Sequence, residues 1–301
     1  MGSSFATSNY FKNFSDFIII RQKYDNRFSS EVYLLLSKST GCKFYAIEIL
    51  IDESLTKEYL EESLVINNRC DSLLKMKSFL LRRDDSFCTR VNKFYAIYDY
   101  VNEDLSQEIS RRFKSKIDFR DSEIIKLMNV IVKSMQHLEK FKRPHSALHS
   151  SSIFIESTNF DLFLLDNMVI KQPSNAFSDC QTNQDIYIAP ENLDRNLNNM
   201  SISNIFLADV FVTGLIILET ILKEKLSRIY DSVNSVIHKK ELEKLIEKAG
   251  KKVSSQIIEI LSKMLTVDRD KRPNFTQIND MLQNIAMFQE INDEKVYELN
   301  L

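Results

Sequence analysis

The side chains that could do acid–base chemistry are concentrated between His145 and Ile155, which read His-Ser-Ala-Leu-His-Ser-Ser-Ser-Ile-Phe-Ile. Histidine titrates near neutrality, so His145 and His149 are candidates for proton transfer or, when protonated, for binding phosphate. The serines and cysteines of the chain show no recognisable pairing of a nucleophile with a base. Asp166 is a candidate metal ligand with help from Ser152. One carboxylate without a second strong ligand makes a poor magnesium site.

Composition sets the class of protein that must position these residues. The chain has 301 residues, of which 44% are hydrophobic and 27% charged, as in an ordinary folded protein with one large or two small domains. A net charge of −2 predicts no nucleic acid partner and no membrane surface. The four cysteines are scattered, which indicates reduced thiols and a cytoplasmic protein.

Two segments have features that can accompany membrane association. Met1 to Ala6 resembles the start of a myristoylated protein, but Ala6 stands where Ser or Thr is expected. The longest apolar run, residues 205–222, contains Asp209 and Glu219 and predicts a buried helix and no membrane span. No apolar leader segment is visible in the first residues, so we expect no secretory signal.

Glycine is strongly depleted. The chain contains four glycines, whereas average usage would give about 21. A loop that holds phosphate needs clustered glycines, because the backbone must approach the anion closely. The absence of such a cluster argues against every glycine-rich nucleotide fingerprint.

The hydrophobic pattern changes along the chain. Short apolar runs separated by polar turns predict strands in the first hundred residues, at 17–20, 31–36, 43–50, 79–87 and 94–101. Helical spacing predicts helices at 54–74, from Asp121 as N-cap onward, and at 205–222, 254–265 and 274–288. Residues 239–252 read as a solvated helix face. Strands followed by helices indicate an α+β protein with two lobes.

Three motifs in chain order carry a family resemblance. They are Tyr187-Ile-Ala-Pro-Glu191, Asp209-Val-Phe-Val-Thr-Gly214 and Asp268-Arg-Asp-Lys-Arg-Pro273. With this spacing the chain resembles a eukaryotic protein kinase over roughly residues 15–288. The resemblance implies a bilobal fold with a small β-rich N-lobe (15–101) and a larger helical C-lobe (102–288), between tails at 1–14 and 289–301. It also implies structural roles for His145 and Asp209, and an ion pair between Arg272 and Glu191.

The chemical motifs of that family are mostly altered. The family's Val-Ala-Ile-Lys, whose lysine holds phosphates, aligns with Tyr-Ala-Ile-Glu ending at Glu48. The catalytic loop carries Ala147 at the position of the base and Ser152 at that of the metal-binding Asn. In the Asp-Phe-Gly segment the Asp survives as Asp166, followed by Asn167 and Met168.

The resemblance also indicates a vestigial nucleotide cleft. Its expected lining is Val32, Ala46, Tyr98 and Phe154, and the two aromatic side chains should make it smaller. Aligning on Val32 places Asp25, Arg27 and Ser30 at the three glycine positions of the family's phosphate loop. We therefore expect no catalytic residues, no confident nucleotide or metal ligands, and no bound ATP or Mg²⁺.

The function indicated is that of a pseudokinase: a catalytically inactive kinase-like domain acting as a protein-interaction scaffold or allosteric regulator. Its partner would be a protein, for example an active kinase or that kinase's substrate. One alternative is a divergent kinase with weak serine/threonine phosphotransfer, using Asp166 and a relocated lysine such as Lys38 or Lys43. Another is a nucleotide sensor that binds ATP without turnover.

Overall fold

The chain forms two compact units in the computed structural model. The structure describes residues 14–25, 30–50, 57–86, 89–156, 158–166, 187–193, 201–231 and 236–285. Unit 1 comprises Met1–Val101 and Asp166–Lys171, and unit 2 comprises Asn102–Leu165 and Gln172–Leu301. Asp166 therefore belongs to the β-rich unit, although its place in the sequence had assigned it to the helical lobe. Arg27, Asn167, Met168, residues 1–13 of the N-terminal tail and the C-terminal tail lie outside the described residues.

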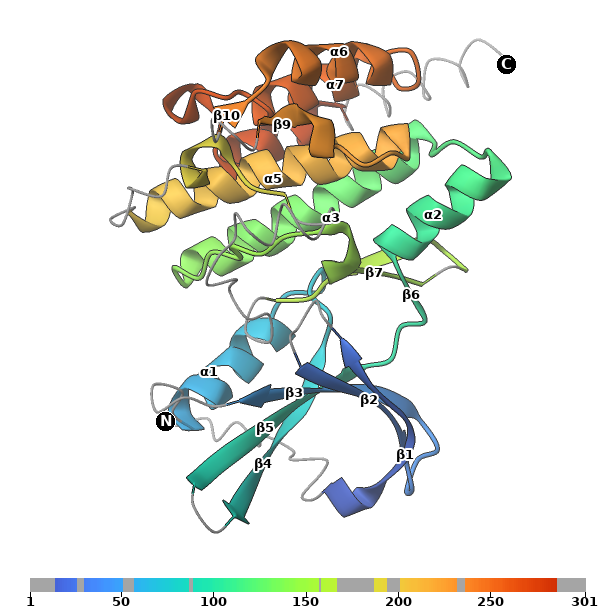
Figure 1. The fold of residues 1–301 in the computed structure, drawn as a ribbon, viewed down its shortest axis with the longest axis vertical. Coiled ribbons are helices and arrows are strands. Elements are labelled where there is room, and N and C mark those ends of the chain that lie inside the picture. The colour runs from blue at the N-terminus through green and yellow to red at the C-terminus, as the bar shows by residue number, and fades with distance from the viewer. Residues whose placement is uncertain are drawn as a thin grey trace, which may run out of the picture. The chain divides into compact units, whose positions relative to one another are not determined.

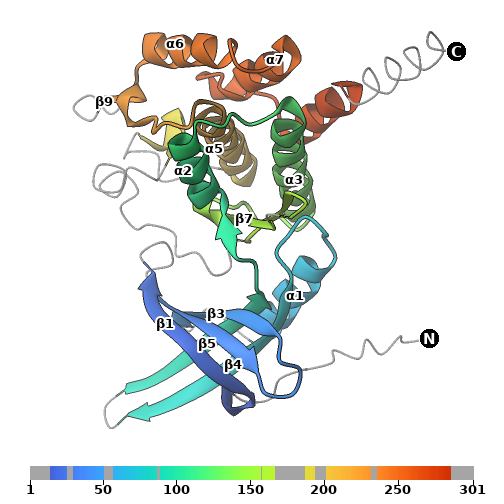
Figure 2. The same ribbon diagram turned by 90° about the vertical axis from the view of Figure 1, so that its right-hand side faces the viewer.

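Unit 1 is built on an antiparallel sheet, which is curled in Figure 2. Its strands are β1 (Phe17–Asp25), β2 (Ser30–Ser37), β3 (Lys43–Leu50), β4 (Met76–Ser86) and β5 (Thr89–Asp99), in the order β1-β2-β3-β5-β4. A 3-10 turn (η1, Phe14–Asp16) precedes the sheet, and helix α1 (Lys57–Asn68) joins β3 to β4. Gly41 closes the β2–β3 turn with φ of 69°, a left-handed conformation that glycine adopts without strain.

One face of this sheet carries a hydrophobic core. Alternate residues of the strands point to the same side, so each strand contributes every second side chain. The core consists of Phe17, Tyr33, Leu35, Phe44, Ala46, Leu80, Tyr95 and Ile97. The five predicted strands are confirmed. Their runs contain aromatic and β-branched residues, which favour strands.

Unit 2 is mainly helical. Its larger helices are α2 (Leu105–Ser115), α3 (Asp121–Lys140), α5 (Ile202–Leu222), α6 (Lys239–Ala249) and α7 (Ser255–Met264), and residues 275–285 are also helical. A small sheet has the order β6-β7-β8, from β6 (Glu103–Asp104), β7 (Ile153–Glu156) and β8 (Asp161–Leu164). Strands β9 (Tyr230–Asp231) and β10 (Val236–Ile237) pair with each other.

Helix α5 forms the centre of unit 2, between α3 on one side and α6 and α7 on the other (Figure 1). It is long and apolar enough to cross a membrane, but 89% of its most apolar window is buried within the protein, as in the core helix of a globular domain. Gly214 allows its close contact with the end of α7, because a Cβ there would lie 2.8 Å from Leu265 Cδ2.

Helix α2 was not predicted, and one helix start was placed wrongly. α2 begins with a capping box in which the side chains of Asp104 and Gln107 each accept a backbone N–H of the other residue. Asp121 was expected to be the N-cap of α3, but the N-cap is Arg120. The Asp121 carboxylate instead accepts the backbone N–H of Ser254 at 3.1 Å.

Candidate functional site

The loop that contains His145 is fixed by Asp209 of α5. Both oxygens of this buried carboxylate are used, because they accept the backbone N–H groups of His145 and Ser146, each at 2.8 Å. Ser146 has a φ of 60°, in the left-handed region that non-glycine residues seldom occupy. Asp209 therefore stabilises a strained turn, which is the structural role that the resemblance implied.

The pKa shifts of Asp209 and His145 are also consistent with a structural role for both residues. Burial raises the pKa of Asp209 to about 7, against the opposing effect of its two N–H donors. Burial lowers the pKa of His145 to about 4, so its ring is neutral near pH 7. Nε2 of His145 lies 2.8 Å from the carbonyl of Leu165. A carbonyl only accepts, so Nε2 carries the proton and donates it.

The positions that the resemblance assigns to the catalytic base and the metal-binding amide carry Ala147 and Ser152. Ala147 ends in a methyl group, which takes no proton. Ser152 is fully buried and its hydroxyl donates to the carbonyl of His149 at 2.7 Å. The backbone N–H of Ser152 donates to the same carbonyl at 3.0 Å and closes the 3-10 turn η2 (Ser150–Ser152). The Ser152 hydroxyl is thus used to fold the loop.

His149 makes a second local contact. Its Nδ1 lies 2.7 Å from the hydroxyl of Ser151, and both residues are buried. A serine hydrogen-bonded to a histidine is the beginning of a nucleophile–base pair. Here the two residues are separated by one position within a single tight turn, so we interpret the contact as part of that turn.

The strand register separates the expected lining residues of unit 1. Directly opposed residues lie on the same face, and the opposed pairs are Val32 with Ile47, and Tyr45 with Tyr98. Because side chains alternate, Val32 and Tyr98 share one face, and Ala46 lies on the other. Ala46 instead faces the same side as Tyr33, its partner across the strands. Phe154 belongs to unit 2, where it is buried on β7 opposite Phe163.

Glu48 lies on the Ala46 face and is buried there. It accepts a hydrogen bond from the hydroxyl of Tyr33 at 3.0 Å, and burial together with this bond raises the pKa of Tyr33. The expected acidic residues of the following helix, Glu61 and Glu62, are exposed. On the opposite face of β3, which carries Tyr98, the residue next to Glu48 is Ile47. Neither face of β3 therefore carries a lysine at this point.

Asp166 is bound within unit 1. Its Oδ2 accepts a hydrogen bond from Asn67 Nδ2 at 2.9 Å, and the Tyr98 hydroxyl lies 3.4 Å from its Oδ1. Burial and the Asp166 charge raise the pKa of Tyr98, so the phenol stays protonated and donates. Asn67 also donates to the carbonyl of Leu74 at 3.0 Å and accepts from the N–H of Met76 at 2.7 Å.

Asn67 is a candidate site residue that the sequence motifs do not indicate. It connects the end of α1, the start of β4 and Asp166, and it is completely buried. The available signal was its spacing: Asn67 follows Leu64 by three positions, on the face of α1 that the helical pattern predicts to be buried. A buried amide requires hydrogen-bond partners, and a surviving carboxylate is one such partner.

These residues do not fit Mg²⁺–ATP, the ligand expected for this fold. The β3 positions bear Glu48 and Ile47 where a phosphate-binding cation is needed. The Asp166 carboxylate already accepts hydrogen bonds from two side chains, and the Ser152 hydroxyl donates to the carbonyl of His149 within a turn. Among the residues that the structure describes, no three His, Cys, Asp or Glu side chains group as metal ligands.

The predicted ion pair of unit 2 is confirmed. Arg272 Nη1 donates to Glu191 Oε1 at 2.7 Å, and Nη2 donates to Oε2 at 3.1 Å. The same guanidinium donates to the carbonyl of Leu207 at 2.6 Å and to that of Thr266 at 3.0 Å. Its carbon lies 4.9 Å from the ring centre of Phe211. This bidentate pair joins three separate segments of the unit.

The β-rich unit, the helical unit with its central α5 and the Arg272–Glu191 pair define the bilobal α+β architecture of a kinase. A family model described as the protein kinase domain matches residues 28–282, and the chain belongs to this family. Among solved structures, the kinase domain of PknI from Mycobacterium tuberculosis matches with a TM-score of 0.60 and 14% identity, over 91% of this chain and 97% of that one. At this identity the likeness concerns the fold. No curated protein matches the sequence.

Proposed function

We propose that this chain is a catalytically inactive member of the protein kinase family that acts by binding other proteins. The observation that carries the proposal is the state of the chemical positions: Ala147 replaces the base, and Asp166 is already bound by Asn67 and Tyr98. Phosphoryl transfer depends on positioned charges. A chain without the base and without the phosphate-binding lysine has lost both acid–base catalysis and electrostatic stabilisation.

The retained residues support the same proposal. The buried contacts of Arg272, Glu191 and Asp209 maintain the shape of unit 2 and touch no reacting group. A protein that functions through its surface requires these contacts and does not require the chemical ones. Location inside the cell is part of the proposal, supported by the free thiols of Cys42 and Cys70.

Thermal unfolding with millimolar ATP, with and without Mg²⁺, tests the proposal, together with a phosphotransfer assay on a generic protein substrate. A ligand at about 100 times its dissociation constant stabilises the folded state by about 2.7 kcal/mol, which shifts a melting curve measurably. We expect no shift and no transfer. A shift that requires Mg²⁺ and disappears in Asp166→Asn would contradict the inactive state and favour a nucleotide sensor. Transfer to substrate would favour a divergent kinase.

A further inference from the structure

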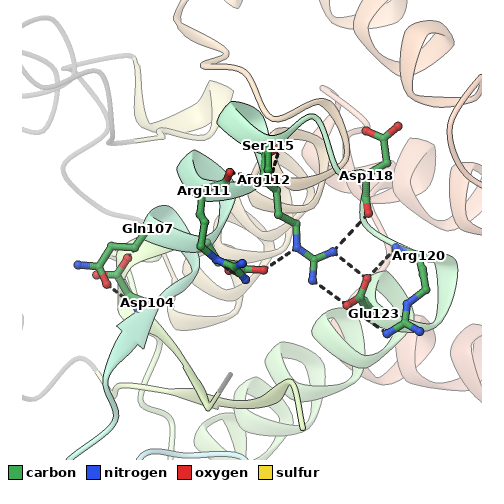
Figure 3. A network of polar contacts seen from close by, with 9 residues as sticks. Asp104, Gln107, Arg111, Arg112, Ser115, Asp118, Arg120 and Glu123 are labelled. Carbon is green, nitrogen blue, oxygen red and sulfur yellow. Dashed lines mark hydrogen bonds and ion pairs between the residues drawn. The ribbon is translucent and has the colours of Figure 1, made fainter. Parts of the chain in front are cut away.

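Arg112, whose side chain is 12% exposed, fixes the connection between α2 and α3, which we call the α2–α3 corner (residues 111–120). Arg112 Nε donates to Glu108 Oε1 at 2.5 Å, and its two Nη atoms donate to the Glu123 carboxylate at 2.9 and 2.8 Å (Figure 3). The guanidinium carbon lies 4.0 Å from the centre of the Phe119 ring. These contacts tie the last turn of α2 to the first turn of α3.

Three further contacts join the corner to the rest of unit 2. Asp118 forms ion pairs with Lys223 at 2.6 Å and with Lys252 at 2.9 Å. Lys223, the C-cap of α5, also donates to the backbone carbonyl of Ile117 at 2.8 Å. The backbone of the corner is therefore held by three other helices or loops, and its geometry does not depend on a partner.

This rigid corner presents two large apolar side chains to solvent. Phe113 is 64% exposed and Ile117 is 54% exposed. Lys116 adopts the left-handed conformation, and the Ile117 N–H bonds back to the Arg112 carbonyl at 3.1 Å. This is the geometry of a Schellman motif, which turns Ile117 back toward the last turn of α2, where Phe113 lies. Preorganised exposed aromatic and aliphatic groups are typical of binding hot spots.

The surroundings of these two side chains are cationic. Within residues 111–120 the charged residues are Arg111, Arg112, Lys114, Lys116, Asp118 and Arg120, and their ion-pair partners are Glu108, Glu123, Lys223 and Lys252. Seven cations against three carboxylates give this group a net charge of +4, whereas the whole chain has −2. A local excess of this sign attracts an acidic partner.

We propose that the α2–α3 corner binds an acidic segment of a partner protein, which places an aromatic or aliphatic side chain against Phe113 and Ile117. A lipid surface fits less well. The apolar residues of the helical part of α2, Leu105 and Ile109, are buried, so only its end exposes apolar groups. Membrane-surface helices use a continuous apolar face. The inference gives the protein-binding part of the proposed function a location and rests on that part, while the loss of catalysis does not depend on it.

Peptide display tests the docking surface on the full chain. A library of random twelve-residue peptides is selected against the immobilised protein, and the affinity of the enriched peptides is then measured in solution. Two double variants probe the surface: Phe113→Ser with Ile117→Ser, and Lys114→Glu with Lys116→Glu. Ile202→Ser is the matched control, because Ile202 is also exposed, at 47%, but on α5. Melting curves establish that every variant is folded.

We expect enriched peptides with acidic residues flanking an aromatic or aliphatic one. Each double variant should weaken their binding by about tenfold or more, as truncation of a hot spot does, and the control should bind like the native chain. Added salt should weaken binding, because it screens the charges. The proposal is overturned if no peptide is enriched, if the enriched peptides lack acidic residues, or if both double variants retain affinity.

Two other occupants have their own assays. Binding of phosphatidylserine vesicles that is lost in both double variants would assign the corner to a lipid surface and overturn the protein partner. Self-association in sedimentation that the same variants abolish would assign it to a second copy, with the same consequence. The phosphotransfer assay is separate: transfer by a chain whose corner still binds peptides would refute the inactive state and leave the docking surface intact.

Discussion

Removal of the Arg272 charge should destabilise unit 2 strongly. In Arg272→Met the long side chain is replaced by an apolar one that can still lie beside Phe211. The Arg272 side chain is 0% exposed and that of Glu191 is 8% exposed. The variant therefore leaves a carboxylate buried without its cation, and the carbonyls of Leu207 and Thr266 lose a charged donor. Removing one partner of a buried pair costs about 3–5 kcal/mol.

Urea and thermal unfolding, followed by circular dichroism, measure this loss. For a domain of this size, 1 kcal/mol corresponds to about 2–4 °C, so the melting temperature should fall by roughly 6–20 °C. The control is Lys263→Met, which breaks the exposed pair with Glu259 (45% and 68% exposed) and should cost less than about 1 kcal/mol. The double variant Arg272→Met with Glu191→Leu should recover part of the loss, because neither charge remains buried. A loss below about 1 kcal/mol in Arg272→Met would refute this account of the pair.

Three further outcomes are expected. Asn67→Ala should lower the free energy of unfolding by roughly 2–4 kcal/mol, since it removes three buried hydrogen bonds; an unchanged urea midpoint would contradict the role of this amide. Arg112 holds the pKa of Glu123 at about 2, below its ordinary 4.5. The stability that this pair contributes is present above pH 4.5 and is lost as the pH falls toward 2. In Glu123→Gln the free energy of unfolding should therefore fall less steeply between pH 4.5 and 2 than in the native chain; the same slope in both proteins would contradict the role of this pair. The triple variant Glu48→Lys, Ala147→Asp, Ser152→Asn should not transfer phosphate, because Glu48 lies on the opposite sheet face from Tyr98 and Asp166; measurable transfer would overturn this.

The fold was predictable because its signals are local. Short apolar runs in β1 to β3 and helical spacing in α3, α5 and α7 arise from side chains that a sequence displays directly. The helix predicted at 54–74 corresponds to α1, which is shorter and spans Lys57–Asn68. Helix α2 was missed because, among its first residues, the capping box of Asp104 and Gln107 is the main signal and the apolar stripe is short.

The sequence locates the substituted positions of the candidate site but not the contacts of its residues. Motif alignment identifies Ala147 and Ser152 because they are substitutions within a recognisable frame. It could not place Glu48, since a shift of one residue in strand register moves a side chain to the other face. Nor could it find the bond between Asn67 and Asp166, which are 99 positions apart. The spacing of Asn67 predicts a buried amide that needs a hydrogen-bond partner, but the choice of Asp166 as that partner follows from packing.

The contact between Asn67 and Asp166 has a consequence for the conformations that the chain can populate. A hydrogen bond to a charged group is worth about 1.5–3 kcal/mol, so this single bond limits the state with a released carboxylate to about one molecule in ten or fewer. A ligand that requires the released state loses affinity by the same factor. A substitution at Asn67 should therefore act like an effector. It would raise the population of the state with a released Asp166 carboxylate without changing any surface residue that a partner contacts.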